Sequence, residues 1–374
     1  MCWPCRRLEL SWKTGVNHNL TSLYEKLTRW MQEQGLDALL ISKRTNIRYF
    51  SGFAGSAGVL VLTATQRKIF VDFRYVEQAA QTAPDFESVK GHGNPMDAAV
   101  DFLQQQGFCK IGFENQVTTV AEWNRLTAKV PVEKWVPFQL DRFRTIKTAT
   151  EIAKIAKAAA IADAALGQVL PLFRPGTTEQ KLAAALEYEM RQRGSERTSF
   201  ETILASGPRS ALPHGAASDR TLEAGDFVVI DFGAVFEGYH SDVTRTVCIG
   251  KASSRQREIY DIVLSAQLAG LAAIRPGVLC REVDQAARSV IESAGFGSYF
   301  GHGLGHSVGL EIHENPRLSP TAGEETLSPG MVVTVEPGIY LPAWGGVRIE
   351  DLVVVTDSGC RILSQTPKSL LELV

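Results

Sequence analysis

The chain has 374 residues, of which 44% are apolar, a length and composition typical of a soluble globular protein with about two domains. Its 39 Lys and Arg nearly balance 41 Asp and Glu, which argues against a nucleic-acid-binding surface or a polybasic membrane contact. The uninterrupted apolar runs are much shorter than the ~20 residues of a membrane span, and no apolar export segment follows Arg6 and Arg7, so we expect a cytoplasmic protein.

The first twenty residues match no domain pattern. Cys2 and Cys5 form a C-x-x-C pair, but a redox motif of this type opens a helix after a strand, and here it opens the chain. We therefore expect residues 1–20 to be a disordered or extra tail. The other cysteines are scattered through regular patterns, which indicates small core residues.

Strand and helix signals alternate between residues 21 and 141, which predicts an α/β domain. A capping box from Ser22 to Glu25 predicts the start of the first helix, and Gly35 fits its end. Further helices are expected at 74–81, 96–106 and 120–130, and strands at 36–42, 58–63, 68–72, 110–114 and 132–138. We find no paired catalytic groups in this part.

From about residue 145 to the end, helices and strands are clustered, which predicts an α+β domain with a mainly antiparallel sheet. Helices are expected from Thr150 to Leu170, from a capping box at Thr177 to Gly194, from a capping box at Ser253 to Ile274, and at 281–294. Strands are expected at 227–233, 239–247, 331–341 and 346–355.

Carboxylates interrupt these apolar, β-forming runs at Asp231, Asp242, Glu336 and Glu350. Any one of them alone could be a surface residue of an edge strand. A buried carboxylate, however, must be paired, protonated or bound to a cation. The strand period of two places Arg348 on the face of Glu350, but one arginine cannot balance four negative charges. Divalent cations can, so the pattern predicts a metal site.

A glycine-rich segment contains three histidines within twelve residues, His302, His306 and His313. A lone histidine is more often structural, which is our interpretation of His18 and His92, whereas three together favour a metal or proton-transfer site. An oxygen-rich ligand set with one or two imidazoles suits Mn²⁺ best, with Co²⁺ and Zn²⁺ as alternatives. More ligands than one ion can use indicate two divalent metal ions per subunit.

These segments resemble the pita-bread metallopeptidases, which include methionine aminopeptidase, aminopeptidase P and prolidase. The matching segments are 212–220, 228–246, 300–314, 334–340 and 347–351. Residues 21–141 also resemble the N-terminal domain of the proline-directed members. The resemblance implies a creatinase-like α/β domain at 21–141 and an α+β pita-bread catalytic domain, with a curved, mainly antiparallel sheet, at 145–374.

The resemblance also implies a metal-ligand set. Asp231 would bind one ion with both oxygens, and Asp242 and Glu350 would bridge the two ions. His306 and Glu336 would complete the ligands of the second ion. Two cations held in this way would lower the pKa of a shared water towards neutrality.

The remaining roles that the resemblance implies concern the substrate. Glu336 would carry a proton from the attacking water to the leaving proline nitrogen. His214 and His313 would stabilise charge developing on the carbonyl oxygen. His302 would contact the substrate, and Arg348 would orient a carboxylate, either a metal ligand or part of the substrate.

The implied activity is hydrolysis of the bond between an N-terminal residue and proline in small Xaa-Pro peptides. That bond is a tertiary amide without an N–H, so the enzyme needs a pocket for the proline ring. The sequence leaves open whether the enzyme is an Xaa-Pro dipeptidase or an aminopeptidase P, and the resemblance suggests a homodimer. Two alternatives on the same fold are a non-catalytic binding protein, which typically loses metal ligands, and a creatinase-like amidinohydrolase, which uses no metal.

Overall fold

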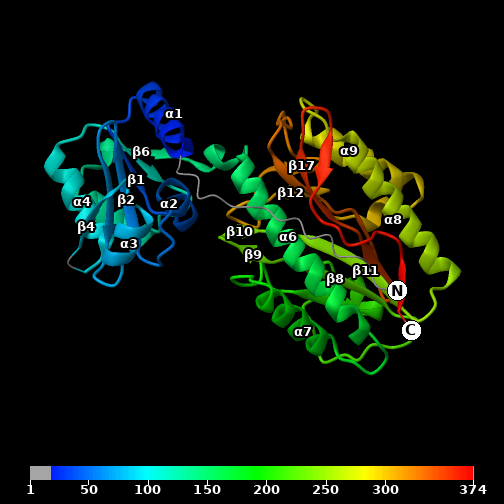
Figure 1. The fold of residues 1–374 in the computed structure, drawn as a ribbon. Coiled ribbons are helices and arrows are strands. Elements are labelled where there is room, and N and C mark those ends of the chain that lie inside the picture. The colour runs from blue at the N-terminus through cyan, green and yellow to red at the C-terminus, as the bar shows by residue number, and fades with distance from the viewer. Residues whose placement is uncertain (1–17, 92, 374) are drawn as a thin grey trace. The chain divides into compact units, whose positions relative to one another are not determined.

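The computed structural model of the protein describes residues 18–91 and 93–373 (Figure 1). The chain divides into two compact units between Leu140 and Asp141. The first helix begins at His18, before the capping box that was predicted to start it. Residues 1–17, most of the expected tail, lie outside the described residues, as does His92.

A six-stranded mixed sheet forms the centre of the first unit, in the order β4-β3-β2-β1-β5-β6. Its strands are β1 (Ala38–Ile41), β2 (Gly58–Thr63), β3 (Arg67–Val71), β4 (Glu87–Lys90), β5 (Ile111–Glu114) and β6 (Trp135–Phe138). The helices are α1 (His18–Gln34), α2 (Arg44–Ser51), α3 (Val76–Thr82), α4 (Pro95–Gln106) and α5 (Val120–Lys129). The α/β prediction is confirmed, including the hairpin of β2 and β3.

Helix α2 and strand β4 are absent from the sequence-based prediction. Helix α2 follows Lys43, whose side chain makes no capping hydrogen bond. Instead, the buried carboxylate of Glu114 accepts hydrogen bonds from the backbone N–H groups of Ser42 and Lys43, each 2.7 Å long. It also accepts one from the side-chain amide of Asn46 at 2.5 Å. A carboxylate from a distant strand therefore stabilises this helix N-terminus, and no local motif indicates it.

The second unit contains four long helices among its described residues: α6 (Ala149–Val169), α7 (Glu179–Gln192), α8 (Ser254–Ala273) and α9 (Cys280–Ser293). One sheet has the order β19-β11-β8-β7, with β7 (Ile203–Ser206), β8 (Phe227–Phe232), β11 (Val243–Ile249) and β19 (Leu371–Leu373). The other has the order β13-β12-β14-β17-β18, with β12 (Gly305–Ser307), β13 (Glu314–Leu318), β14 (Val332–Val335), β17 (Asp351–Val355) and β18 (Cys360–Ile362).

Two short ribbons complete the unit, β9 (Val235–Phe236) with β10 (Tyr239–His240), and β15 (Gly338–Leu341) with β16 (Gly345–Arg348). Apart from the parallel pair of β11 and β19, the described strand pairs of this unit are antiparallel. Helices α6 and α7 share an apolar core with β8 and β11, while α8 and α9 share another with β14 and β17 (Figure 1). The α+β prediction with mainly antiparallel pairing is confirmed.

Helix α6 and the turn after it are long and apolar enough to cross a membrane, by length and composition alone, with a mean hydropathy of 1.4. The predicted helix from Thr150 to Leu170 corresponds to it, and Lys154, Lys157 and Asp163 interrupt its apolar residues. Its buried face, which includes Ala162 and Leu166, belongs to the apolar core shared with α7 and β8. These contacts are those of a core helix.

The capping boxes predict the helix starts of this unit with one error. The box at Ser253 is present, but α7 is capped by Thr178 rather than by Thr177. The Thr177 carbonyl accepts the Leu222 N–H, and Thr178 forms a β-bridge with Thr221. The chain therefore stays extended through Thr178, which delays the helix by one residue.

Candidate metal centre

Each of three predicted strands is interrupted next to its carboxylate. Asp242 lies between β10 and β11, Glu336 between β14 and β15, and Glu350 between β16 and β17. Of the four carboxylates, Asp231 alone lies inside a strand, β8. The prediction that all four lie within strands is therefore wrong.

The strand breaks have one local cause, at Pro337, and otherwise follow from hydrogen bonds to distant segments. Pro337 has no N–H with which to continue the ladder after Glu336. The Glu336 N–H donates instead to the Leu304 carbonyl at 2.8 Å, and the Glu350 N–H donates to the Thr244 carbonyl at 3.1 Å. At each break the chain passes from one sheet to another. The alternation of side chains along a strand therefore does not fix where these carboxylates point.

The glycine-rich segment allows β12 to approach β14 very closely. A Cβ atom on Gly305 would lie 2.1 Å from the Thr334 carbonyl oxygen, a distance that no side chain tolerates. The next N–H, that of His306, donates to the Thr334 hydroxyl at 3.0 Å. Gly305 is therefore required to place His306.

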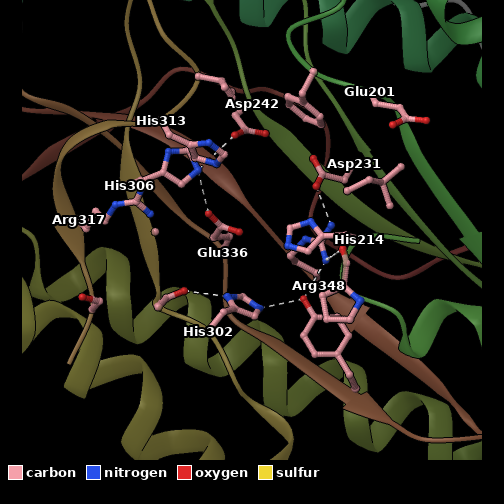
Figure 2. A pocket seen from close by; sticks show the side chains of 18 of the residues that line it. Glu201, His214, Asp231, Asp242, His302, His306, His313, Arg317, Glu336 and Arg348 are labelled. Atoms are coloured by element: carbon pink, nitrogen blue, oxygen red, sulfur yellow. Dashed lines mark hydrogen bonds and ion pairs between the residues drawn. The ribbon is translucent and has the colours of Figure 1, made fainter. Parts of the chain in front are cut away.

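The five expected metal ligands meet at one place. Asp231, Asp242 and Glu350 each present an oxygen within 4.8 Å of the other two. His306 Nε2 lies 3.6 Å from Asp242 Oδ2 and 3.4 Å from Glu336 Oε1. Figure 2 shows Asp231, Asp242, His306 and Glu336 directed towards a common space.

The electrostatics of this cluster suit cations. Burial and the neighbouring carboxylates raise the pKa of Asp242 and that of Glu350 well above the usual range. Burial raises the pKa of Glu336 to about 7. It also lowers the pKa of His306 to about 3, so this imidazole is neutral and has a lone pair to share. So many carboxylates can be ionised together only if positive charge lies between them.

Two carboxylate oxygens test whether the residues fit a metal. Asp231 Oδ1 and Glu350 Oε1 are buried, and neither has a hydrogen-bond partner within the part of the chain that the structure describes. The second oxygen of each is bonded: Arg348 donates to Asp231 Oδ2, and the Thr244 hydroxyl donates to Glu350 Oε2, both at 2.7 Å. Buried oxygens without donors are costly, and an oxygen-rich set suits hard divalent ions. The residues therefore fit the expected cations.

Arg348 lies behind the carboxylates. It is 3% exposed, and besides Asp231 it donates to the Thr244 hydroxyl, to the Tyr340 hydroxyl at 2.8 Å and to the Pro213 carbonyl at 3.2 Å. Arg348 and Glu350 both contact the Thr244 hydroxyl, although the chain breaks between them. The guanidinium is thus engaged within the protein.

A cavity of about 570 Å³ opens in front of the cluster, and His214, His302 and His313 line it. The His313 ring meets the His306 ring edge-on, with centroids 4.4 Å apart. His302 Nδ1 lies 2.8 Å from the Gly303 carbonyl and must donate to it, so Nε2 accepts from the Tyr340 hydroxyl at 3.0 Å (Figure 2). Burial lowers the pKa of His302 to about 4 and also lowers the pKa of His313.

The sequence-based reasoning missed other residues of the cavity wall, among them Phe200, Glu201, Ile312, Arg317 and Tyr340. Tyr340 lies in a segment that carried the family resemblance. Its position in the sequence, however, does not indicate that its hydroxyl is hydrogen-bonded to both His302 and Arg348. Buried and exposed residues alternate along β13, and Arg317 lies at an exposed position, which is typical of a solvated surface charge. Among the described residues its guanidinium has no hydrogen-bond or ion-pair partner, so it is available to a ligand.

Both units match known family models. Residues 153–357 match the model described as metallopeptidase family M24, and residues 24–146 match the creatinase/prolidase N-terminal domain. This chain belongs to metallopeptidase family M24. Membership implies divalent metal ions, which the ligand set of this M24 chain fits.

Similarity to M24 relatives extends over nearly the whole chain. An Xaa-Pro dipeptidase of Pyrococcus furiosus is 40% identical over 351 residues, which are 93% of this chain and 99% of the relative. The solved Xaa-Pro dipeptidase from Bacillus anthracis is 42% identical, with a TM-score of 0.92, and the match covers 95% of this chain and 100% of that one. An X-Pro aminopeptidase from Thermotoga maritima is 39% identical, with a TM-score of 0.87 and coverage of 94% and 99%. The predicted resemblance is confirmed.

Proposed function

We propose that this M24 chain is a dinuclear metallopeptidase that hydrolyses the peptide bond between an N-terminal residue and proline. The observation that carries the proposal is a cluster of four carboxylates and one imidazole beside a cavity, with two buried oxygens that lack donors. Relatives described as Xaa-Pro dipeptidases and as an X-Pro aminopeptidase support the substrate class.

The five ligands divide between two ions in this proposal. Asp231 would bind one ion, Asp242 and Glu350 would be shared by both, and His306 and Glu336 would complete the ligands of the second ion. The bound cations would polarise the scissile carbonyl and make hydroxide available near neutral pH. Mn²⁺ is our first candidate because the set is rich in oxygen, with Co²⁺ and Zn²⁺ as alternatives.

Proton transfer and charge stabilisation fall to residues that line the cavity. Glu336 takes the proton of the attacking water and passes it to the proline nitrogen, which leaves as an amine. His214 and His313 donate to the carbonyl oxygen as it becomes negative. His302 faces the substrate through its ring, because both of its nitrogens are bonded within the protein.

We assign Arg348 to the orientation of Asp231 rather than to the substrate. Its hydrogen bond to Asp231 Oδ2 leaves Oδ1 facing the cluster, and its Nε and Nη1 donate to Thr244, Tyr340 and Pro213. Arg317 replaces it as the candidate for a substrate carboxylate, because it lines the cavity with no described partner. A cation in this place favours dipeptides, whose proline carries a free carboxylate.

Changing Arg317 to methionine tests this preference. We expect kcat/KM for an Xaa-Pro dipeptide to fall about 10–100-fold, since a hydrogen bond to a charged group contributes ~1.5–3 kcal/mol. Hydrolysis of the same dipeptide with an amidated C-terminus should change by less than about threefold, because that substrate has no carboxylate. Arg281→Met, on the exposed side of α9, is the matched control. Equal losses with both substrates would contradict this role.

A cleavage panel tests the proposed function itself. The wild-type protein, loaded in turn with Mn²⁺, Co²⁺ and Zn²⁺, is offered an Xaa-Pro dipeptide, an Xaa-Pro tripeptide and an Xaa-Ala dipeptide. We expect cleavage to require both the metal and proline in the second position. Metal-independent turnover of creatine would favour an amidinohydrolase, and absence of both metal binding and hydrolysis would favour a non-catalytic binding protein.

We further propose a homodimer that acts in the cytoplasm, with domains at residues 21–141 and 145–374. The division of the chain after Leu140 supports these boundaries. The four cysteines within the described residues are free, which is usual in a reducing compartment. Light scattering tests the assembly, since one chain has a mass of 40.9 kDa.

A further inference from the structure

A buried ionic cluster lies behind the histidines of the site. Glu314 is 8% exposed, and it accepts hydrogen bonds from Arg144 Nη1 at 2.7 Å and from Lys147 Nζ at 3.2 Å. Arg144 and Lys147 are themselves only 2% and 4% exposed. Burial lowers the pKa of the Lys147 ammonium, and Glu314 opposes that shift. Glu314 thus helps the Lys147 ammonium to remain charged in the interior.

The loop at 307–314 is folded around the Glu314 carboxylate. The Glu311 N–H donates to Glu314 Oε1 at 3.2 Å. A Cβ atom on Gly309 would come within 2.6 Å of Glu314 Oε2, so the chain passes directly over the carboxylate at that point. The side chain of Glu314 therefore fills the centre of the loop that precedes β13.

The same cluster contacts the neighbours of both histidines. Lys147 Nζ donates to the Ser307 hydroxyl at 2.8 Å, and Ser307 directly follows His306. The register of β12 against β13 shifts between His306 and Ser307, so the hydrogen bonds between these strands do not by themselves fix the position of His306. Glu314 directly follows His313. Both imidazoles are thus fixed, through adjacent residues, to one ionic cluster.

We propose that Glu314, held by Arg144 and Lys147, is a positioning residue that fixes His306 and His313 in the geometry of the site. The inference rests on the proposed function, in which these histidines bind metal and stabilise the carbonyl oxygen. The described wall of the cavity does not include Glu314, Arg144 or Lys147, so they act through the loop. A buried ion pair adds little stability over a well-packed apolar set, and defining one arrangement is its better-attested use.

Glu314→Gln tests the inference because it keeps the size of the side chain and removes its charge. We expect Mn²⁺ binding, measured by titration calorimetry, to weaken about 10–100-fold, as for other residues that orient a metal ligand. We expect kcat to fall about 10²-fold, because a shift of about 1 Å in a catalytic group has that cost, while KM changes much less. The visible spectrum of the Co²⁺-loaded protein, which reports ligand geometry, should change as well.

Asp226→Asn is the matched control. Asp226 is a buried carboxylate of the same unit, and its Oδ2 lies 2.6 Å from Arg220 Nη1. Neither residue belongs to the described cavity wall. The substitution also leaves a cation without its carboxylate, so it reproduces the general cost of losing a buried ion pair. We expect Mn²⁺ affinity and the Co²⁺ spectrum to stay unchanged in this variant.

Lys147→Met provides a second variant if Glu314→Gln does not fold. It keeps the pair of Arg144 with Glu314 and removes the contact with Ser307, so Mn²⁺ affinity should fall about tenfold. A folded Glu314→Gln protein with wild-type Mn²⁺ affinity and Co²⁺ spectrum would overturn the inference. Weakened Mn²⁺ binding in a protein whose wild type cleaves no Xaa-Pro peptide would support the positioning role and overturn the proposed function.

Discussion

Replacing Glu350 with alanine is expected to lower kcat for Xaa-Pro peptides by about 10³-fold or more. Stabilisation by catalytic cations amounts to several kcal/mol, and each ~1.4 kcal/mol is tenfold in rate. Glu350 is 1% exposed, and its Oε1 has no donor among the described residues, so no neighbouring group replaces the lost ligand. The measurement is the initial rate of dipeptide hydrolysis with saturating Mn²⁺.

The matched control for this loss is Glu324→Ala, because the Glu324 side chain is 83% exposed and pairs with a surface arginine. It should retain full activity. The metal-free Glu350→Ala protein should be at least as stable as the metal-free wild type, since it has one fewer buried carboxylate among mutually repelling groups. Thermal unfolding therefore separates a lost ligand from a misfolded protein. Full activity of the metal-free Glu350→Ala protein would contradict the proposal of a dinuclear metallopeptidase.

Removing the metal from the wild-type protein is expected to abolish hydrolysis and to make stability fall as pH rises. In the metal-free protein the pKa values of Asp242 and Glu350 are raised well above normal, and that of Glu336 to about 7. The folded state then holds more protons than the unfolded state. The resulting stabilisation is complete below the ordinary carboxyl pKa and is lost as pH rises through the raised values.

Bound cations should reverse this dependence, because they favour the ionised carboxylates. At a metal concentration a thousandfold above Kd, binding adds ~4 kcal/mol, or a rise in Tm of roughly 10 °C for a domain of this size. Calorimetric scans with Mn²⁺ and with a chelator, at pH 5.5 and pH 8, measure the gain at each pH. We expect a clearly larger gain at pH 8. An equal gain in Tm at both pH values would contradict the raised pKa values of the clustered carboxylates.

Much of the site can be predicted from residue types alone. Asp231, Asp242, Glu336 and Glu350 stand out because carboxylates are rare in apolar β-forming runs, and a buried charge needs a compensating partner. His302, His306 and His313 stand out as a group in a glycine-rich segment, and the family resemblance implies that His306 is the ligand. The predicted capping box at the start of α8 is also local, since both partners lie within one helical turn.

Elements that depend on distant contacts escape this reasoning. The start of α2 depends on Glu114, and α7 begins one residue late because of a bridge to Thr221. Within the described residues, the cavity guanidinium without a partner is that of Arg317, while Arg348, which the pattern emphasised, is already bonded. Whether a charge is available to a ligand depends on its partners, and strand periodicity contains no information about them.

By itself, the sequence determined the two-part α/β and α+β organisation and singled out the four carboxylates of the candidate metal site. Both follow from local rules, because periodicity sets the elements and the cost of burying charge singles out the carboxylates. The tertiary structure alone decided where the strands break beside Asp242 and Glu350, and which groups lie behind the carboxylates. Those features arise between segments far apart in the chain, where close backbone approach at Gly305 and the ionic cluster at Glu314 set the geometry.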